Sequence, residues 1–169
     1  VAVFRYRLFE AVPTLRDGNE TFFAITEPAG GSDPAGAIQT RAERRGDKWV
    51  INGRKVFISR AHDAPWGIVF ARTDRARGRA GISCFILEHG TPGFTAKPIR
   101  VIRTSAIPND VSFEDCEIPA ENLIGQEGQG LDGRHVDAVG QAQARQHAHA
   151  QGQRRHHGRG AGHRHHGDA

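Results

Sequence analysis

The most informative stretch of this sequence is Phe22-Phe23-Ala24-Ile25-Thr26-Glu27-Pro28-Ala29-Gly30-Gly31-Ser32-Asp33. Its aromatic and aliphatic run predicts a short buried strand, which the proline ends because it lacks a backbone donor. The small residues that follow predict a loop, in which Gly30 and Gly31 are expected to take backbone angles closed to other residues. Thr26 and Ser32 place hydroxyl groups at the two sides of this loop. The pattern therefore fits a loop that lies against a flat or charged ligand, or an ordinary glycine-rich turn.

A hairpin is predicted further along the chain. The runs Trp49-Val50-Ile51 and Val56-Phe57-Ile58 flank the dipeptide Asn52-Gly53. This dipeptide favours a two-residue type I′ turn, because both of its positions tolerate positive φ. We therefore expect two antiparallel strands that meet at Asn52-Gly53.

Further short apolar runs predict more strands, at residues 67–73, 82–87, 94–102 and 111–116. Residues 37–45 alternate small or apolar residues with polar ones, as an exposed strand does. Many short strands, with turn signals about every eight to twelve residues, indicate a mainly β fold of the barrel or sandwich type.

Composition excludes several classes of function. The 169 residues suit one domain, and the net charge is only +4. Most of the basic excess comes from the last 39 residues, so no basic folded surface is indicated and we expect no nucleic-acid partner. No apolar run approaches the roughly 18–20 residues of a membrane span.

The two cysteines, Cys84 and Cys116, lie inside apolar runs. One disulfide is an alternative, but two buried thiols in a reducing compartment are favoured. No basic-then-apolar export segment opens the sequence, so we expect a cytoplasmic protein. The chain starts with Val and contains no Met, which suggests a fragment or a start codon translated literally.

The segment 131–169 differs from the rest, because it is rich in His, Arg, Gly and Ala and poor in large apolar residues. Such a composition does not offset the entropy of ordering a chain, so we expect a disordered tail. Its histidine clusters suggest Zn²⁺ or Ni²⁺ as an alternative, but no scaffold fixes a geometry, and no metal site is predicted. A break in the reading frame near residue 131 is our hypothesis for the change in composition.

Three ordered motifs resemble the acyl-CoA dehydrogenase family. They are Ala24-Ile25-Thr26-Glu27-Pro28 with Gly31-Ser32-Asp33, then Gly46-Asp47-Lys48-Trp49-Val50-Ile51-Asn52-Gly53-Arg54-Lys55-Val56-Phe57-Ile58-Ser59, and then Phe113-Glu114-Asp115-Cys116 with Ile118-Pro119-Ala120-Glu121-Asn122-Leu123-Ile124-Gly125. The resemblance implies that residues 21–130 are the small β-barrel middle domain of that family. It also implies that residues 1–20 are the end of an N-terminal helical domain.

The resemblance further implies an FAD site. The residues that match the family's cofactor contacts are Phe23, Ala24, Ile25, Thr26, Ser32, Phe57, Ile58 and Ser59. Phe57 would pack on the isoalloxazine face, where the family commonly has Trp. Thr26 would bond the pyrimidine side, Ser59 would bond near N5, and Ser32 would face both the cofactor and the acyl-CoA thioester. Without a cofactor, these hydroxyls would cap loop donors or end a core strand.

The activity implied by the family is oxidation of acyl-CoA to 2,3-enoyl-CoA, with electron-transfer flavoprotein as the usual electron acceptor and with homo-oligomers as the usual assembly. The family's catalytic Glu belongs to its C-terminal helical domain, so no catalytic residue is assigned here. Glu27 and Asp33 are expected to be solvated or capping residues. The chain is expected to be truncated and inactive alone. A monooxygenase-like flavin enzyme and a non-catalytic β-barrel remnant are the alternatives.

Overall fold

The computed structural model describes residues 21–102 and 107–131. The described part contains eight strands and three short helices. In chain order they are β1 (Phe22–Ala24), α2 (Pro34–Ala37), β2 (Arg41–Arg45), β3 (Lys48–Ser59), β4 (Trp66–Arg72), η1 (Gly78–Gly81), β5 (Ile82–Glu88), β6 (Phe94–Pro98), β7 (Pro108–Pro119), η2 (Ala120–Asn122) and β8 (Leu123–Ile124). The prediction of a mainly β fold is confirmed.

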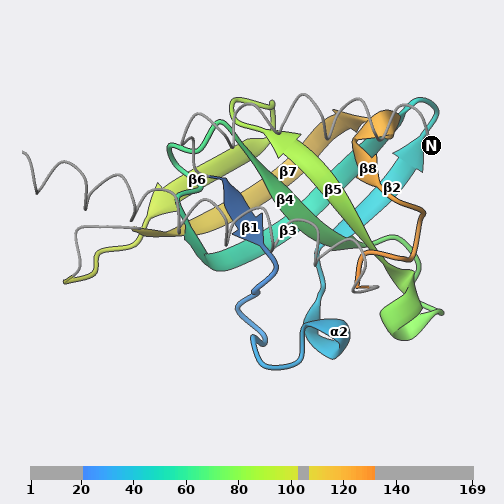
Figure 1. Ribbon diagram of the computed structural model, residues 1–169, viewed down its shortest axis with the longest axis horizontal. Coiled ribbons are helices and arrows are strands. Elements are labelled where there is room, and N and C mark those ends of the chain that lie inside the picture. Colours follow the sequence, from blue (N-terminus) through green and yellow to red (C-terminus); the bar gives the residue numbers. More distant parts are fainter. Residues whose placement is uncertain (1–20, 103–106, 132–169) are drawn as a thin grey trace, which may run out of the picture.

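All the strands belong to one sheet, in which seven follow the order β6-β7-β3-β2-β4-β5-β8 and β1 joins at β4 (Figure 1). The two longest strands, β3 and β7, are antiparallel neighbours, with Lys48 opposite Pro119 at one end and Ser59 opposite Pro108 at the other. The short strand β1 pairs in parallel with β4, so that Phe22 faces Gly67. The stretch that follows β1 reaches β3, where the Val56 amide donates to the Thr26 carbonyl.

The sheet curls around a common core. The ring of Phe22 on β1 stacks on that of Phe94 on β6, with centroids 5.5 Å apart, although these strands are not neighbours in the sheet. Trp49 on β3 likewise meets Phe85 on β5 edge to face at 5.2 Å. Contacts between strands that are not paired require the sheet to fold over on itself, which confirms the predicted barrel-like architecture.

A second apolar cluster explains why β4 and β5 read as continuous apolar runs. Val69 belongs to the inner core, whereas its neighbours Ile68 and Phe70 belong to a cluster on the other face. Phe23 packs against this outer cluster, with its ring centroid 5.0 Å from that of Phe70. Because both faces of these strands are covered, their side chains do not alternate between apolar and polar.

The predicted hairpin at Asn52-Gly53 is wrong. β3 runs through this dipeptide, and the register with β7 shifts between Ile51 and Gly53, as at a β-bulge. The hairpin turn lies earlier, at Gly46-Asp47, where only Gly46 has a positive φ, of 64°, as in type II′ turns. The Asn52 side chain instead exchanges hydrogen bonds with Asp115 on β7, at 3.1 Å and 2.9 Å.

The other strand predictions differ from the structure at their ends. The strand expected over 94–102 ends at Pro98, and the one expected over 111–116 is the middle of the longer β7. The segment 37–45 is a strand only from Arg41, and Ala37 is the last residue of the short helix α2. Asp33 caps the start of α2 by accepting a hydrogen bond from the Gly36 amide. Asp33 is thus a capping residue, as expected.

Both cysteines are buried and unpaired, which confirms the expectation of two thiols. Burial raises the pKa of the Cys116 thiol to about 12 and raises that of Cys84 further still. No helix within the described ranges is both long and apolar enough to cross a membrane. The segments 1–20 and 132–169, including the histidine clusters, lie outside the described residues.

Candidate functional site

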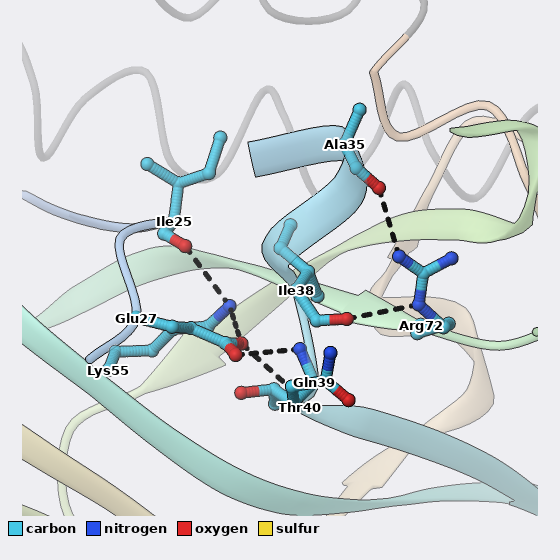
Figure 2. Close-up of polar contacts among 8 residues, drawn as sticks. All are labelled: Ile25, Glu27, Ala35, Ile38, Gln39, Thr40, Lys55 and Arg72. Carbon is cyan, nitrogen blue, oxygen red and sulfur yellow. Dashed lines mark hydrogen bonds and ion pairs between the residues drawn. The ribbon is translucent and has the colours of Figure 1, made fainter. Parts of the chain in front are cut away.

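The loop after β1 is fixed to the middle of β3. The backbone N–H of Val56 donates to the carbonyl of Thr26 at 2.9 Å. The Lys55 ammonium donates to the carbonyl of Ile25 at 3.3 Å and to Oε1 of Glu27 at 2.8 Å (Figure 2). Three consecutive residues of the loop are thus bonded to two consecutive residues of the strand.

Glu27 and Lys55 form a buried ion pair. Glu27 is 5% exposed and Lys55 is fully buried. The remaining capacity of the carboxylate is used by backbone donors, since Oε2 accepts from Gln39 N at 2.6 Å and Oε1 accepts from Thr40 N at 3.0 Å. The expectation that Glu27 is solvated is therefore wrong, whereas the alternative, a capping residue, agrees with the two backbone N–H groups that it accepts from. The loop turns its carboxylate inward, onto a lysine that sequence reasoning did not single out.

The environment keeps both members of the pair charged near neutral pH. Burial by itself would raise the pKa of Glu27, but the Lys55 charge and the hydrogen bonds from Lys55, Thr40 and the Gln39 amide hold it below its usual value. Burial lowers the pKa of Lys55 to about 8, against the opposing effect of the Glu27 charge. A carboxylate bonded in this way is already committed to three donors, which disfavours a role as a general base.

Phe57 is held in an unusual conformation two residues after Lys55. Its φ is 61°, and the pairing of β3 with β7 shifts register between Lys55 and Ile58. A bulky residue with positive φ is an outlier, and such backbone strain clusters at functional sites. The side chain is 65% exposed, so the bulge presents an aromatic ring outside the core.

The other residues of the expected cofactor site lie in three settings. Ser59 and Ser32 are exposed, and Thr26 is half-buried. The Ala24 and Ile58 side chains lie in the inner core, so only their backbone is available to a ligand. A third set, Phe23 and Ile25, is half-buried against the outer cluster.

The structure brings several of these residues into one region. Thr26 is bonded to Val56, which precedes Phe57 in the chain and lies three positions before Ser59. Thr26 and the end of β3 therefore lie on adjacent segments, as the FAD prediction requires. The individual contacts with a cofactor remain predictions.

The glycines of the loop serve a different purpose from the one expected. Neither Gly30 nor Gly31 has a positive φ, so the predicted special backbone angles are wrong. A Cβ on Gly30 would lie 2.8 Å from the Cβ of Ala37, so it is close packing against α2 that requires glycine there. Within the described residues, no group of three His, Cys, Asp or Glu side chains could hold a metal ion.

A comparison with known protein families shows to which family the chain belongs. The family model described as "Acyl-CoA dehydrogenase, middle domain" matches residues 22–116. The chain belongs to the acyl-CoA dehydrogenase family.

Individual proteins and solved structures that resemble the chain agree with this assignment. The chain is 47% identical over 112 residues to the short-chain specific acyl-CoA dehydrogenase, mitochondrial, of Rattus norvegicus, covering 64% of this chain and 27% of the relative. The butyryl-CoA dehydrogenase structure from Megasphaera elsdenii is similar with a TM-score of 0.64 and 39% identity, over 68% of this chain and 30% of that one. A structure described as an electron transferring flavoprotein of Acidaminococcus fermentans matches with a TM-score of 0.65 and 44% identity, over 68% of this chain and 30% of that one. The chain thus spans about a third of the length of these proteins or less.

Proposed function

We propose that residues 21–131 form one wall of an FAD site, and that the enzyme to which this wall belongs oxidises an acyl-CoA thioester to its 2,3-enoyl form. The observation that carries the proposal is the exposed ring of Phe57. It stands on a strained bulge, at the point where the Thr26 loop is bonded to β3. Strain of this kind persists only where the surrounding structure enforces it, and here it presents an apolar surface to a ligand.

The residues present fit a flavin. An isoalloxazine needs an apolar face on which to pack and fixed donors near its polar edge. Phe57 offers the face, and the Thr26 and Ser59 hydroxyls, both of which belong to residues that are at least partly exposed, offer donors. Phe23 and Ile25, with the backbone of Ala24 and Ile58, would line the ring. Ser32 would face the cofactor and the thioester.

When bound, FAD supplies a hydride acceptor for the β-carbon of the acyl group. The chain's own residues would hold the ring and exclude water from one side of it. Glu27 is the one buried carboxylate in the described part of the chain, and it is committed to Lys55 and two amides. We therefore propose that the base for the α-proton is supplied from outside the described residues, and that this wall is inactive alone.

The substrate class and the electron acceptor proposed for the whole enzyme follow its relatives. Acyl-CoA is the substrate class of the rat and Megasphaera proteins by their names, and the Acidaminococcus structure is named for an electron transferring flavoprotein. We propose the same substrate class, an electron-transfer flavoprotein as electron acceptor and a homo-oligomer. A cytoplasmic location agrees with the two free thiols. The dehydrogenase names of these relatives favour this reaction over the monooxygenase-like alternative.

A titration of the purified chain with FAD tests the proposal. We expect saturable binding, seen as quenched flavin fluorescence and a resolved shoulder in the visible flavin band. Phe57→Ala should weaken the binding, whereas Val101→Ala, which removes an exposed apolar side chain outside the site, should not. A spectrum that stays that of free FAD at all protein concentrations would contradict the proposal.

A further inference from the structure

We propose that the buried Lys55–Glu27 pair positions the two segments that form the proposed wall of the FAD site. In this role it fixes the loop after β1 on β3 at the one register that bonds Thr26 to Val56, the residue before Phe57. The inference rests on the proposed function only for the nature of the ligand. The positioning itself is a property of the chain, which can be measured without one.

The pair lies between the two segments that it would align. On the loop, Glu27 directly follows Thr26. On the strand, Lys55 precedes Phe57 by two residues and stands at the register shift with β7. Between them runs the single backbone hydrogen bond from Val56 to Thr26, of 2.9 Å. One backbone bond gives little control of register, so the charged contacts on either side of it supply what β-pairing supplies elsewhere.

The same carboxylate also fixes the far end of the loop. It accepts from the amides of Gln39 and Thr40, where the chain enters β2 (Figure 2). The Thr40 carbonyl in turn accepts from the Arg72 amide at 2.7 Å. The Arg72 guanidinium donates to the carbonyls of Ile38 at 3.0 Å and Ala35 at 2.9 Å. Both ends of the 25–40 loop are therefore anchored through polar contacts on β3 and β4.

A buried ion pair suits this task for a physical reason. Two buried charges are tolerated only when they stay paired and hydrogen-bonded, so a slip of the loop by one residue would leave the Lys55 charge unpaired in the core. An apolar pair at the same place would tolerate such a slip at lower cost. The pair therefore excludes alternative registers, which is the best-attested use of buried polar groups.

The experiment compares three variants with the wild-type chain. Lys55→Met removes one charge, and Glu27→Gln with Lys55→Met removes both while keeping the shape. Lys48→Met is the matched control, because it makes the same change on the same strand but breaks an exposed pair with Glu117. Amide hydrogen exchange by NMR reads the Val56, Gln39 and Thr40 amides. The Ala120 and His89 amides, which bond to Asp47 and Pro65, serve as internal references.

We expect both Lys55 variants to exchange the Val56 amide at least tenfold faster than wild type, measured relative to the two reference amides. The double variant is decisive, since it leaves no buried charge to destabilise the whole fold. Its affinity for FAD should fall at least tenfold under conditions where it is fully folded, and Lys48→Met should change neither reading. Unchanged relative exchange at Val56 in the double variant would overturn the inference. If the wild-type chain binds FAD, an equal FAD affinity of the double variant would overturn it as well. A wild-type chain that binds no FAD would overturn the proposed function instead, and the exchange result would still decide the positioning role.

Discussion

Gly53 lies so close to Thr40 that a Cβ on Gly53 would sit 2.5 Å from Thr40 Oγ1 and 2.6 Å from Thr40 Cα. Its φ of 151° is also rare for residues with side chains. The strand β3 bulges at this residue and brings its backbone against the start of β2. The glycine thus allows a close approach of two backbones inside the sheet.

Gly53→Ala should lower the free energy of unfolding by roughly 2–4 kcal/mol, because the new methyl group meets backbone atoms that cannot move aside easily. Gly46→Ala is the control, since Gly46 has a φ of 64° but nothing within 4 Å of its Cβ position. It should cost about 1 kcal/mol, from backbone strain alone. Urea denaturation measures both values, and equal losses would contradict the close approach.

Phe57→Gly should change stability and binding in opposite directions. Glycine relieves the positive φ of 61° and should raise the free energy of unfolding by about 1 kcal/mol. Loss of the exposed ring should weaken FAD binding by roughly tenfold or more. Phe57→Trp keeps an aromatic face and should bind FAD within a factor of about three of wild type. A glycine variant that loses stability, or binds FAD equally well, would refute this assignment.

Ser59→Ala tests a single hydroxyl. Ser59 is exposed at the end of β3, so its loss should change the stability by less than about 0.5 kcal/mol. If the hydroxyl bonds the flavin, FAD affinity should fall by roughly three- to tenfold. Thr95→Ala, which removes an exposed hydroxyl on β6 that is bonded to Ser112 at 2.6 Å, should leave the affinity unchanged. Equal effects of the two variants would argue against a contact from Ser59.

The buried pair should give the stability a defined dependence on pH. The pKa of Glu27 is lowered in the fold, so its contribution is complete above its ordinary value of 4.5 and is lost as the pH falls through the lower folded value. The pKa of Lys55 is lowered from 10.5 to about 8, so the unfolded chain binds more protons between these values. The contribution of Lys55 to the free energy of unfolding should therefore rise as the pH increases from about 8 to 10.5.

Urea melts at several pH values check both trends. The free energy of unfolding of the wild-type chain minus that of the Glu27→Gln/Lys55→Met variant isolates the pair from other titrating groups. The difference should decrease below pH 4.5 and increase above about pH 8. A difference that stays flat across the whole range would show that the pair does not titrate as described.

The sequence was most informative where the local pattern and the tertiary structure agree. The apolar runs of β4 and β5 predict strands correctly, because their short length and β-branched content favour strands and both of their faces are buried in the fold. The prediction failed at Asn52-Gly53, where the dipeptide favours a turn but Asn52 is bonded to Asp115, 63 residues away in the chain. A local preference of this kind is weaker than long-range pairing along the twelve residues of β3.

In the candidate site, too, some features could be predicted from the sequence and others only appear in the tertiary structure. The motifs around Thr26 and Phe57 identify the family, and the structure brings the two segments together through Val56. Nothing in the local pattern marks Glu27 and Lys55 as partners, because the loop must first fold back over β3 before the two charges meet. The strain at Phe57 could not be predicted from the sequence either, because a positive φ at Phe is imposed by the bulge and is not preferred by the residue.

The contact between the flavin and the bulge of β3 can be observed directly by NMR, with labelled chain titrated with FAD. We expect the largest amide shift changes at Thr26, Phe57 and Ser59, and intermolecular NOEs from the Phe57 ring to the isoalloxazine. Amides near the far end of β3, such as that of Lys48, should not shift. Shift changes that cluster at that far end, with no NOE from Phe57, would contradict the flavin wall described above.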